Sequence, residues 1–374
     1  MWLEKIALLN YKNYPEAAIQ FSEYINCFVG ENGSGKTNLL DAIYYLSFTK
    51  SAFSSTEQQN MRHGASLFLV KGTFCKHEQE YQVQFSLQTG QKKDARNSRV
   101  PYEKLSEHIG LFPAVLISPD DTDLIRERSE NRRRFFDSII SQINHAYLDD
   151  LIRYNHLLLQ RNRLLKQFAE RRTYDGDLLD AYSEPLLTLG RTIYEARQAF
   201  IAQFAPLFEK HYRYLSDDQE SVAIHYQSHF AQPAWKENFY RAQQRDQMLQ
   251  RTTQGTHRDD FVFEIGGYPV KKYGSQGQQK SFVIALKLAQ FEIIHQETGV
   301  KPLLLLDDIF DKLDDHRIAQ LTRLVVDQTF GQLFVTDARP ERTRQLFQEI
   351  EVEKKFFVIR GGEVAEELVE GLDG

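Results

Sequence analysis

The spacing of hydrophobic residues divides this chain into three parts, with changes near residues 125 and 250. In the first part, segments 66–74 and 80–88 alternate apolar and polar residues, and this spacing predicts two antiparallel strands. A basic turn or hairpin is expected directly after them, at 90–99. Other short apolar runs predict strands at 3–9, 18–21, 24–29 and 114–117.

In the middle part, apolar residues recur every three or four positions, which is the spacing of amphipathic helices. No heptad pattern persists over several repeats, so the spacing favours a packed helical lobe over a long coiled coil. We expect Gly176, Pro185 and Pro206 to break these helices. Segment 221–226 is the main strand-like exception.

In the last part, strand and helix patterns alternate, which predicts a parallel sheet flanked by helices. The strands are expected at 261–265, 268–270, 303–306, 332–336 and 355–359, and the helices at 278–296, 316–328 and 341–349. We therefore predict an α/β lobe made of residues 1–125 and 251–374, with a helical lobe, residues 126–250, inserted between its halves.

Composition mainly excludes classes of protein. The 374 residues are 41% hydrophobic and 26% charged, which is typical of a globular protein. No apolar run is long enough to span a membrane, and the N-terminal segment has no signal-peptide pattern, so a cytoplasmic protein is expected. Cys27 and Cys75 have no nearby Cys or His partner, which argues against a cysteine-based zinc site.

The net charge of −6 argues, at first, against binding to nucleic acid. The charge is unevenly distributed, however. Segment 361–374 contains five acidic residues and no basic one, whereas segment 126–172 contains 11 Lys and Arg against 6 acidic residues. The total charge therefore does not exclude a local DNA-binding surface.

A glycine-rich segment between a predicted strand and a predicted helix fits the phosphate-binding pattern G-x-x-x-x-G-K-[ST]. Glycines let successive backbone N–H groups point at phosphate oxygens, and the helix N-terminus adds its dipole. Lys36 would reach the β- and γ-phosphates, and the Thr37 hydroxyl would hold Mg²⁺. The predicted ATP-binding residues are Gly30, Glu31, Asn32, Gly33, Ser34, Gly35, Lys36, Thr37 and Asn38.

Two carboxylates follow the apolar run 303–306. A buried strand of this kind delivers its C-terminal residues to the edge where α/β proteins bind ligands. Asp307 is suited to coordinate Mg²⁺ through water, and Asp308 could activate the attacking water as a general base. Lys36 and Asp308 are therefore the predicted catalytic residues.

Two later segments are similar to motifs of ABC-type ATPases. The first, Ser275, Gln276, Gly277 and Gln278, resembles the signature that receives the γ-phosphate of a nucleotide held by another subunit. Taken alone, Ser275 could equally be a helix N-cap. The second segment, 306–314, has the ABC spacing from the metal-binding Asp307 to the D-loop residues Leu313 and Asp314.

Further segments resemble the RecF family of SMC-like ABC ATPases, and they occur in the family's order over nearly the whole chain. They are LNYKNY at 9–14, SPDD at 118–121, RRRFFD at 132–137 and GTHRDD at 255–260. The resemblance implies a P-loop ABC-type ATPase head, a mixed sheet flanked by helices, with an inserted α-helical lobe. The role of His257 and its neighbours stays open between a nucleotide-coupled role, a structural role and a capping turn.

The resemblance also implies a function. ATP and Mg²⁺ would join two copies into a dimer on single-strand/double-strand junctions of gapped DNA. With RecR and RecO, the protein would help to load RecA past single-strand-binding protein, in DNA replication, recombinational repair and SOS induction. Hydrolysis would be slow, stimulated by DNA, and would act as a switch.

Three departures from the wider ABC pattern bear on hydrolysis. Asp308 stands where the catalytic Glu is usual, and Asp337 stands where a histidine is expected. No Q-loop glutamine follows Pro119, and the sequence leaves open whether Asp120 or Asp121 replaces it. The shorter carboxylate and the missing histidine both predict slow turnover.

Basic side chains are candidates for contact with DNA phosphates, because Arg and Lys match phosphate oxygens. The alternative for each is a solvated helix face or turn. The candidates are Arg132, Arg133, Arg134, Arg161 and Arg163 in the helical lobe, and Lys92 and Lys93 in the basic turn.

Two other functions fit the sequence less well. An ABC transporter subunit needs a coupling surface for a membrane partner, and the inserted lobe and Asp337 speak against it. An ATP-gated nuclease needs an additional acidic metal cluster, which the sequence does not display.

Overall fold

The computed structural model describes residues 1–216, 220–310, 313–326 and 330–371. Within them the chain divides into two compact units. The first unit contains Met1–Asp121 and Leu286–Gly374, and the second contains Thr122–Ala285. The sequence predicted that the inserted lobe ends at residue 250, and this is wrong: it extends to Ala285.

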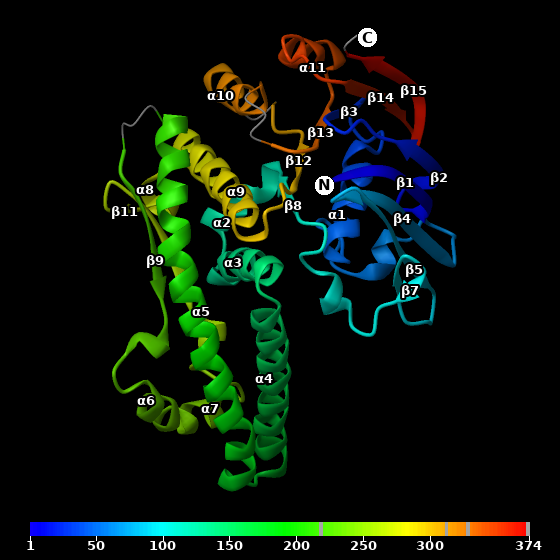
Figure 1. The fold of residues 1–374 in the computed structure, drawn as a ribbon. Coiled ribbons are helices and arrows are strands. Elements are labelled where there is room, and N and C mark those ends of the chain that lie inside the picture. The colour runs from blue at the N-terminus through cyan, green and yellow to red at the C-terminus, as the bar shows by residue number, and fades with distance from the viewer. Residues whose placement is uncertain (217–219, 311–312, 327–329, 372–374) are drawn as a thin grey trace. The chain divides into compact units, whose positions relative to one another are not determined.

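The first unit contains a mixed sheet in the order β15-β14-β3-β13-β12-β8 (Figure 1). The neighbours from β14 to β8 are parallel, and β15 is antiparallel to β14. Its strands are β3 (Ile25–Val29), β8 (Ala114–Ile117), β12 (Leu303–Asp307), β13 (Leu333–Asp337), β14 (Lys354–Arg360) and β15 (Glu363–Glu370). The sequence missed β15, because the acidic residues of segment 361–374 obscure its strand pattern. All residues of β3, β12 and β13 are buried, as expected for central parallel strands.

The same unit contains an antiparallel sheet in the order β2-β1-β4-β5-β6-β7. Its strands are β1 (Trp2–Tyr11), β2 (Tyr14–Gln20), β4 (Leu67–Lys76), β5 (Gln79–Gln88), β6 (Asp94–Asn97) and β7 (Val100–Pro101). The predicted pairing of the two alternating segments is confirmed by β4 and β5. The predicted basic hairpin corresponds to β6 and β7.

Helix α1 (Lys36–Phe48) packs against both sheets of the first unit. Leu39, Ile43 and Leu46 belong to the same buried cluster as Leu3 of β1 and Phe334 of β13. Burying each such aliphatic side chain contributes about 1.5–3 kcal/mol, so this cluster fixes the helix whose N-terminus follows the phosphate loop. The other helical segments of the unit are η1 (Glu57–Asn60), η2 (Leu105–His108), η3 (Pro119–Thr122), α10 (Asp315–Val326) and α11 (Pro340–Phe347).

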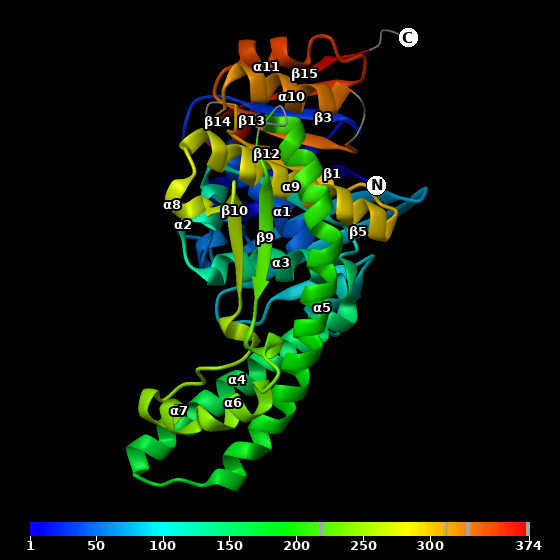
Figure 2. The same ribbon diagram turned by 90° about the vertical axis from the view of Figure 1, so that its left-hand side faces the viewer.

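The second unit is built on the helices α4 (His145–Arg171) and α5 (Gly176–Ser216), which lie side by side (Figures 1 and 2). Gly176 begins α5, but Pro185 and Pro206 lie inside it, so the prediction that they break the helix is wrong. An internal proline costs roughly 3 kcal/mol, and burial of side chains such as Leu186 and Phe204 offsets this cost. Preceding them are α2 (Asp123–Arg126) and α3 (Ser129–Ile143).

Residues 251–285 belong to the second unit because β10 (Asp260–Ile265) pairs with β9 (Val222–Gln227). Phe261, Phe263 and Phe282 add ring contacts to phenylalanines of α3 and α5. The remaining elements are η4 (His229–Ala231), α6 (Trp235–Arg241), α7 (Gln243–Leu249), η5 (Thr256–Arg258), β11 (Tyr268–Pro269), α8 (Val270–Tyr273) and the first part of α9 (Gln276–Thr298), whose residues from Leu286 on belong to the first unit. No helix within the described residues is long and apolar enough to cross a membrane.

Candidate nucleotide site

The predicted phosphate loop and Asp307 meet at the carboxyl edge of the parallel strands in the first unit. The loop follows β3, and Asp307 ends β12, while β13 lies between these two strands. Parallel strands place their C-terminal residues at one edge, and this is where open α/β sheets bind ligands.

Three glycines shape the loop. Gly30, Gly33 and Gly35 have φ angles of 148°, 79° and 115°, a region that other residues rarely adopt. At Gly30 a side chain is also excluded by space, because a Cβ atom would lie 2.4 Å from the carbonyl oxygen of Ile359. The predicted glycine turn is therefore required by the backbone itself.

Lys36 closes the loop on itself. Its Nζ donates hydrogen bonds to the carbonyl oxygens of Gly30 at 2.7 Å and Glu31 at 2.9 Å. Burial lowers the pKa of the ammonium, and the nearby carboxylates of Asp308 and Asp307 act in the opposite direction. A bound triphosphate would supply stronger, charged acceptors for these donors.

Asn13, which lies between β1 and β2, holds the loop from outside. Its Nδ2 donates to the carbonyl oxygen of Ser34 at 3.2 Å, and its Oδ1 accepts from Asn38 at 2.7 Å. A Cβ atom on Gly35 would lie 2.4 Å from Asn13, so this glycine also makes room for the contact. The sequence marked segment 9–14 only by resemblance, and its contact with the loop comes from the tertiary fold.

The predicted metal ligands are adjacent. The Thr37 hydroxyl donates to Asp307 Oδ1 at 2.9 Å, and the Thr336 hydroxyl donates to the same oxygen at 2.8 Å. Burial raises the pKa of Asp307, and these two hydrogen bonds oppose the change. A hydroxyl, a carboxylate and phosphate oxygens are hard oxygen ligands, so this pair fits Mg²⁺.

The pair supplies too few ligands to hold a metal ion without the nucleotide. Among the described residues, no group of three or more His, Cys, Asp or Glu is placed to hold a metal ion. Mg²⁺ typically takes only one or two carboxylates and completes its shell with water and substrate phosphates. The loop also contains a buried hydroxyl, Ser34 Oγ, that has no hydrogen-bond partner, and a bound ligand could supply one.

Asp308 follows Asp307 with a φ of 49°, in the left-handed region. Its backbone N–H donates to the Thr336 hydroxyl at 2.9 Å, so Thr336 contacts both residues of the Asp307–Asp308 pair. The left-handed conformation costs roughly 1–2 kcal/mol for a residue other than glycine. Thr336 is a residue that sequence reasoning missed.

Asp337, which stands where a histidine was expected, is fully engaged with α11. Its carboxylate accepts from Arg342 Nη2 at 2.6 Å, from the Thr343 hydroxyl at 2.8 Å and from the Arg339 backbone N–H at 3.0 Å. Asp337 therefore positions the start of α11. A histidine at this position would donate to the γ-phosphate, whereas the Asp337 carboxylate is already bound to Arg342 and Thr343.

The signature-like segment lies in the second unit, at the start of α9. The N-cap that the sequence left open as the alternative for Ser275 is formed: its Oγ accepts from the Gln278 N–H at 3.2 Å, and Gln278 Oε1 accepts from the Ser275 N–H at 2.6 Å. Ser275 and Gln276 are exposed, and Gly277 is partly exposed. A capping role and a phosphate-facing role are compatible, because the helix N-terminus stays accessible.

The D-loop residues Leu313 and Asp314 are described, whereas residues 311–312 of the same motif lie outside the described residues. Asp314 is exposed and precedes α10, where its Oδ1 accepts from the Arg317 N–H at 3.0 Å. Asp314 therefore acts as a helix-capping side chain within this chain.

One predicted DNA contact is wrong. The Arg161 side chain is 0% exposed and donates to Asp246 at 2.8 Å, to Thr252 at 2.7 Å and to Ser183 at 2.9 Å. A DNA phosphate cannot reach a guanidinium that is enclosed in this way. Its residue type and spacing look like a surface position, and only packing shows otherwise.

The other basic candidates differ in whether their side chains are bound within the protein or exposed to solvent. Arg132 forms two bonds with the carboxylate of Asp260, at 2.8 and 2.9 Å. Arg133 donates to the Asp259 carbonyl oxygen, and Lys93 is held by Glu57 at 2.8 Å and by the Thr49 carbonyl oxygen. Three candidates remain exposed: Lys92, Arg134 and Arg163.

The segment around His257 is anchored in the second unit by the buried side chain of Asp259. Arg197 of α5 binds Asp259 at 2.8 Å and Asp137 at 2.9 Å, and Tyr226 donates to Asp259 at 2.6 Å. Burial lowers the pKa of His257 to about 3 and raises that of Asp259 to about 6. These contacts join α3, α5, β9 and β10, which favours the structural interpretation of this motif.

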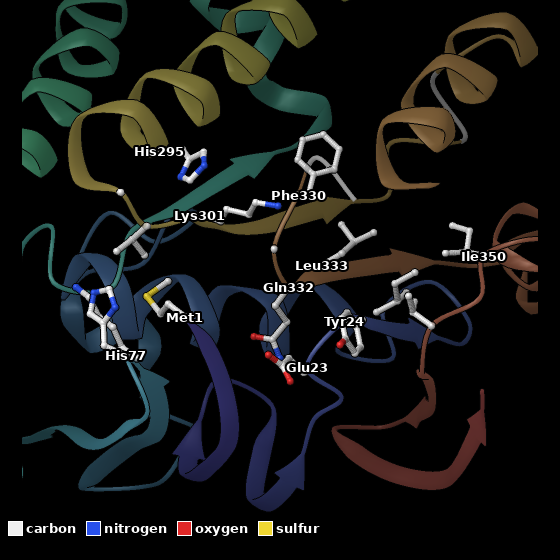
Figure 3. Close-up of a pocket in the computed structure, with 16 residues that line it drawn as sticks. Met1, Glu23, Tyr24, His77, His295, Lys301, Phe330, Gln332, Leu333 and Ile350 are labelled. Atoms are coloured by element: carbon white, nitrogen blue, oxygen red, sulfur yellow. The ribbon is translucent and has the colours of Figure 1, made fainter. Parts of the chain in front are cut away.

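A separate cavity of about 450 Å³ lies in the first unit (Figure 3). Tyr24, Lys301 and Gln332 line it, and they precede the strands β3, β12 and β13. The cavity is therefore at the amino ends of the parallel strands, opposite the phosphate loop, and it is not the predicted nucleotide site.

Comparison with known proteins agrees with this geometry. A family model described as RecF/RecN/SMC N terminal domain matches residues 2–356. The "DNA replication and repair protein RecF" of Cytophaga hutchinsonii is 49% identical over 364 residues, which are 97% of this chain and 96% of that protein. The chain belongs to the RecF family. The RecF of Flavobacterium johnsoniae is 47% identical, over 96% of this chain and 99% of the relative.

Solved structures give the same family and the same fold. A structure of the recombination mediator protein RecF of the RecFOR pathway with ATP has a TM-score of 0.87 and 29% identity, and covers 99% of this chain and 97% of its own. The corresponding structure with ATPrS has a TM-score of 0.88 at 29% identity and covers 98% of both chains. An Smc head domain of Pyrococcus furiosus reaches a TM-score of 0.58 at 18% identity, which shows the ABC-type head fold alone. The predicted fold class is thus confirmed for this RecF-family chain.

Proposed function

We propose that this chain is a DNA-binding ATPase of recombinational repair that uses ATP as a switch. The observation that supports the proposal most is the arrangement of Lys36, Thr37 and Asp307 at one edge of the parallel sheet. Membership of a family of SMC-like ATPases supports ATP binding and hydrolysis in general. The RecF relative solved with ATP supports ATP as the nucleotide.

ATP would join two copies of the chain. Each nucleotide would lie between the Lys36 loop of one copy and the segment 275–278 of the other, whose exposed helix N-terminus suits a γ-phosphate. Only ATP has the γ-phosphate, so it stabilises the closed dimer and ADP does not. Leu313 and Asp314 would contribute to the same interface.

Within each site the residues have distinct roles. Lys36 would turn from the carbonyl oxygens of Gly30 and Glu31 to the β- and γ-phosphates. Thr37 and Asp307 would hold Mg²⁺, which neutralises charge on the phosphate oxygens. Asp308 would accept the proton of the attacking water. Its short side chain and the engagement of Asp337 with Arg342 are consistent with slow hydrolysis.

The closed dimer would bind DNA at single-strand/double-strand junctions, where RecR and RecO would cooperate with it to load RecA. Arg134, Arg163 and Lys92 are the exposed basic candidates, and each is a weak contact by itself. A dimer doubles the number of such contacts, so ATP would raise DNA affinity through effective concentration. On this proposal the protein would act in the cytoplasm, in DNA replication, repair and the SOS response.

The Lys36→Ala substitution tests the proposal. We expect the variant to lose ATP-dependent dimerisation, because no other side chain in the loop supplies a cation to the β- and γ-phosphates. Sedimentation velocity with and without Mg-ATP would measure this loss. Substituting Lys5, an exposed lysine of β1, by Ala is the control and should leave dimerisation unchanged. If Lys36→Ala dimerised at the same ATP concentrations as the wild-type protein, the proposal would be contradicted.

A further inference from the structure

Two tyrosine rings project from the segment that precedes α9. Tyr268 is 63% exposed and Tyr273 59% exposed, and their ring centroids lie 5.4 Å apart in an edge-to-face arrangement. Lys272 Nζ lies 5.1 Å from the centroid of the Tyr273 ring. A single exposed tyrosine is ordinary, but two in contact with a lysine form a small aromatic and cationic surface. We call Tyr268 and Tyr273 the tyrosine pair.

The backbone that bears the tyrosine pair is firmly anchored. Gly266 and Gly267 have φ angles of 58° and 78°, which form the tight turn between β10 and β11. Val270, between the two tyrosines, is 0% exposed, and the N–H of Gly274 donates to its carbonyl oxygen at 2.9 Å. The exposed rings are therefore presented by an ordered segment, so a ligand would meet a surface that is already formed.

The tyrosine pair directly precedes the signature-like segment. Tyr273 is two residues before Ser275, a distance of at most about 7 Å along an extended backbone. In the proposed function, Ser275 and Gly277 face the γ-phosphate of a nucleotide held by a second copy. The same nucleotide is thus the nearest aromatic ligand that the closed dimer would bring to this surface.

We propose that the tyrosine pair stacks against the purine base of the nucleotide bound by the second copy. The inference rests on the proposed function and adds a base-binding element to the half of the site that comes from the other copy. Aromatic side chains and nucleobases stack through their π faces, and Lys272 adds a positive charge beside the ring. Because every purine has such a face, the pair favours a nucleotide over inorganic phosphate without selecting ATP over GTP.

The test is the double substitution Tyr268→Leu with Tyr273→Leu, measured by sedimentation velocity with the non-hydrolysable analogue AMP-PNP and Mg²⁺. A dimer contains two such sites, so we expect its dissociation constant to rise at least about tenfold. Binding of AMP-PNP to the monomer, measured at a protein concentration below that of dimerisation, should not change. Wild-type dimerisation should be weaker with inorganic tripolyphosphate than with AMP-PNP.

Two controls separate stacking from damage to the fold. The double substitution to Phe keeps both rings and should dimerise like the wild type. Substituting Tyr174, which is 50% exposed near the end of α4, by Leu removes an exposed tyrosine elsewhere in the same unit and should also have no effect.

Several outcomes would overturn the inference. An unchanged dimer constant in the Leu variant removes the stacking role, and an equal loss of monomer affinity places the rings on the nucleotide of their own copy. A loss of DNA binding without nucleotide, with normal dimerisation, makes the pair a DNA contact instead. If the wild type and Lys36→Ala respond alike to AMP-PNP, the proposed function fails, and this inference fails with it.

Discussion

At the scale of single residues, the nucleotide site depends on a few side chains that share one acceptor. Asp307 accepts hydrogen bonds from both Thr37 and Thr336, and Thr336 also receives the backbone N–H of Asp308. This network orients the Asp307 carboxylate without using the side chain of Asp308. The two carboxylates can therefore be changed separately, and their roles can be distinguished by substitution.

The Asp308→Asn substitution should separate ATP binding from hydrolysis. The amide has nearly the same shape, so Lys36, Thr37 and Asp307 keep their positions and ATP binding persists. General bases typically contribute 10²–10⁴ in rate, so we expect phosphate release to slow at least about 100-fold. The ATP-bound dimer should then stay on DNA for longer.

Single-turnover phosphate release measures the effect of Asp308→Asn on hydrolysis. The control is Asp149→Asn, at an exposed position on α4. Normal turnover in Asp308→Asn would reject this residue as the base.

At the scale of secondary-structure elements, α4 shows that neighbouring residues of one type can have unrelated roles. Arg161 and Arg163 are two positions apart and therefore lie on different sides of the helix. Arg161 is enclosed against Asp246, while Arg163 is exposed. The helix thus contributes one arginine to the interior of the second unit and another to its surface.

These two arginines give opposite predictions. Arg161→Ala leaves the buried carboxylate of Asp246 unpaired and should lower the free energy of unfolding by about 3–5 kcal/mol. Arg163→Ala should change stability by less than about 0.5 kcal/mol. If Arg163 contacts a phosphate, its loss should reduce the slope of log DNA affinity against log salt concentration by about one. Urea denaturation and DNA titrations at several salt concentrations measure both effects. A stable Arg161→Ala variant would refute the buried ion pair.

At the scale of the whole molecule, each unit contains a histidine that folding keeps neutral. His108 in the first unit is 0% exposed and lies 2.6 Å from the carbonyl oxygen of Leu46 and 2.7 Å from the Tyr102 hydroxyl. Burial lowers the pKa of His108 to about 4, and that of His257 in the second unit to about 3. Asp259 has the opposite shift, since burial raises its pKa to about 6.

The sign of these shifts sets the response to acid. A histidine with a lowered pKa stabilises the folded state fully above about 6.5, and that contribution is lost as the pH falls toward the folded value. In that range each such histidine lowers the free energy of unfolding by about 1.4 kcal/mol for every unit that the pH falls. Asp259 acts in the other direction between about pH 4 and 6, so the two histidines together outweigh it and the protein should lose stability on acidification.

The His108→Gln substitution isolates one of these contributions. Between pH 6 and 4.5, the free energy of unfolding of the first unit should depend less steeply on pH than in the wild type, by about 1.4 kcal/mol per unit. Fluorescence of Trp2 in a Trp235→Phe background reports on the first unit alone. The exposed His63→Gln is the matched control and should keep the wild-type slope. Equal slopes in all three proteins would contradict a neutral, buried His108.

The elements and the chemistry that depend on local pattern could be predicted from the sequence alone. The glycines and Lys36, the carboxylates after 303–306 and the alternating strands were all readable, because each role requires particular residue types at a fixed spacing along the chain. The α/β architecture with an inserted helical lobe followed from the same periodicities.

Features that depend on packing between distant segments became visible only in the folded chain. The inserted lobe was predicted to end at residue 250, but it ends at Ala285 because β10 pairs with β9. Folding also encloses Arg161 and brings Asn13 and Thr336 to the nucleotide site. Burial and long-range hydrogen bonds depend on residues that are far apart in the sequence, so no local pattern distinguishes a buried arginine from an exposed one.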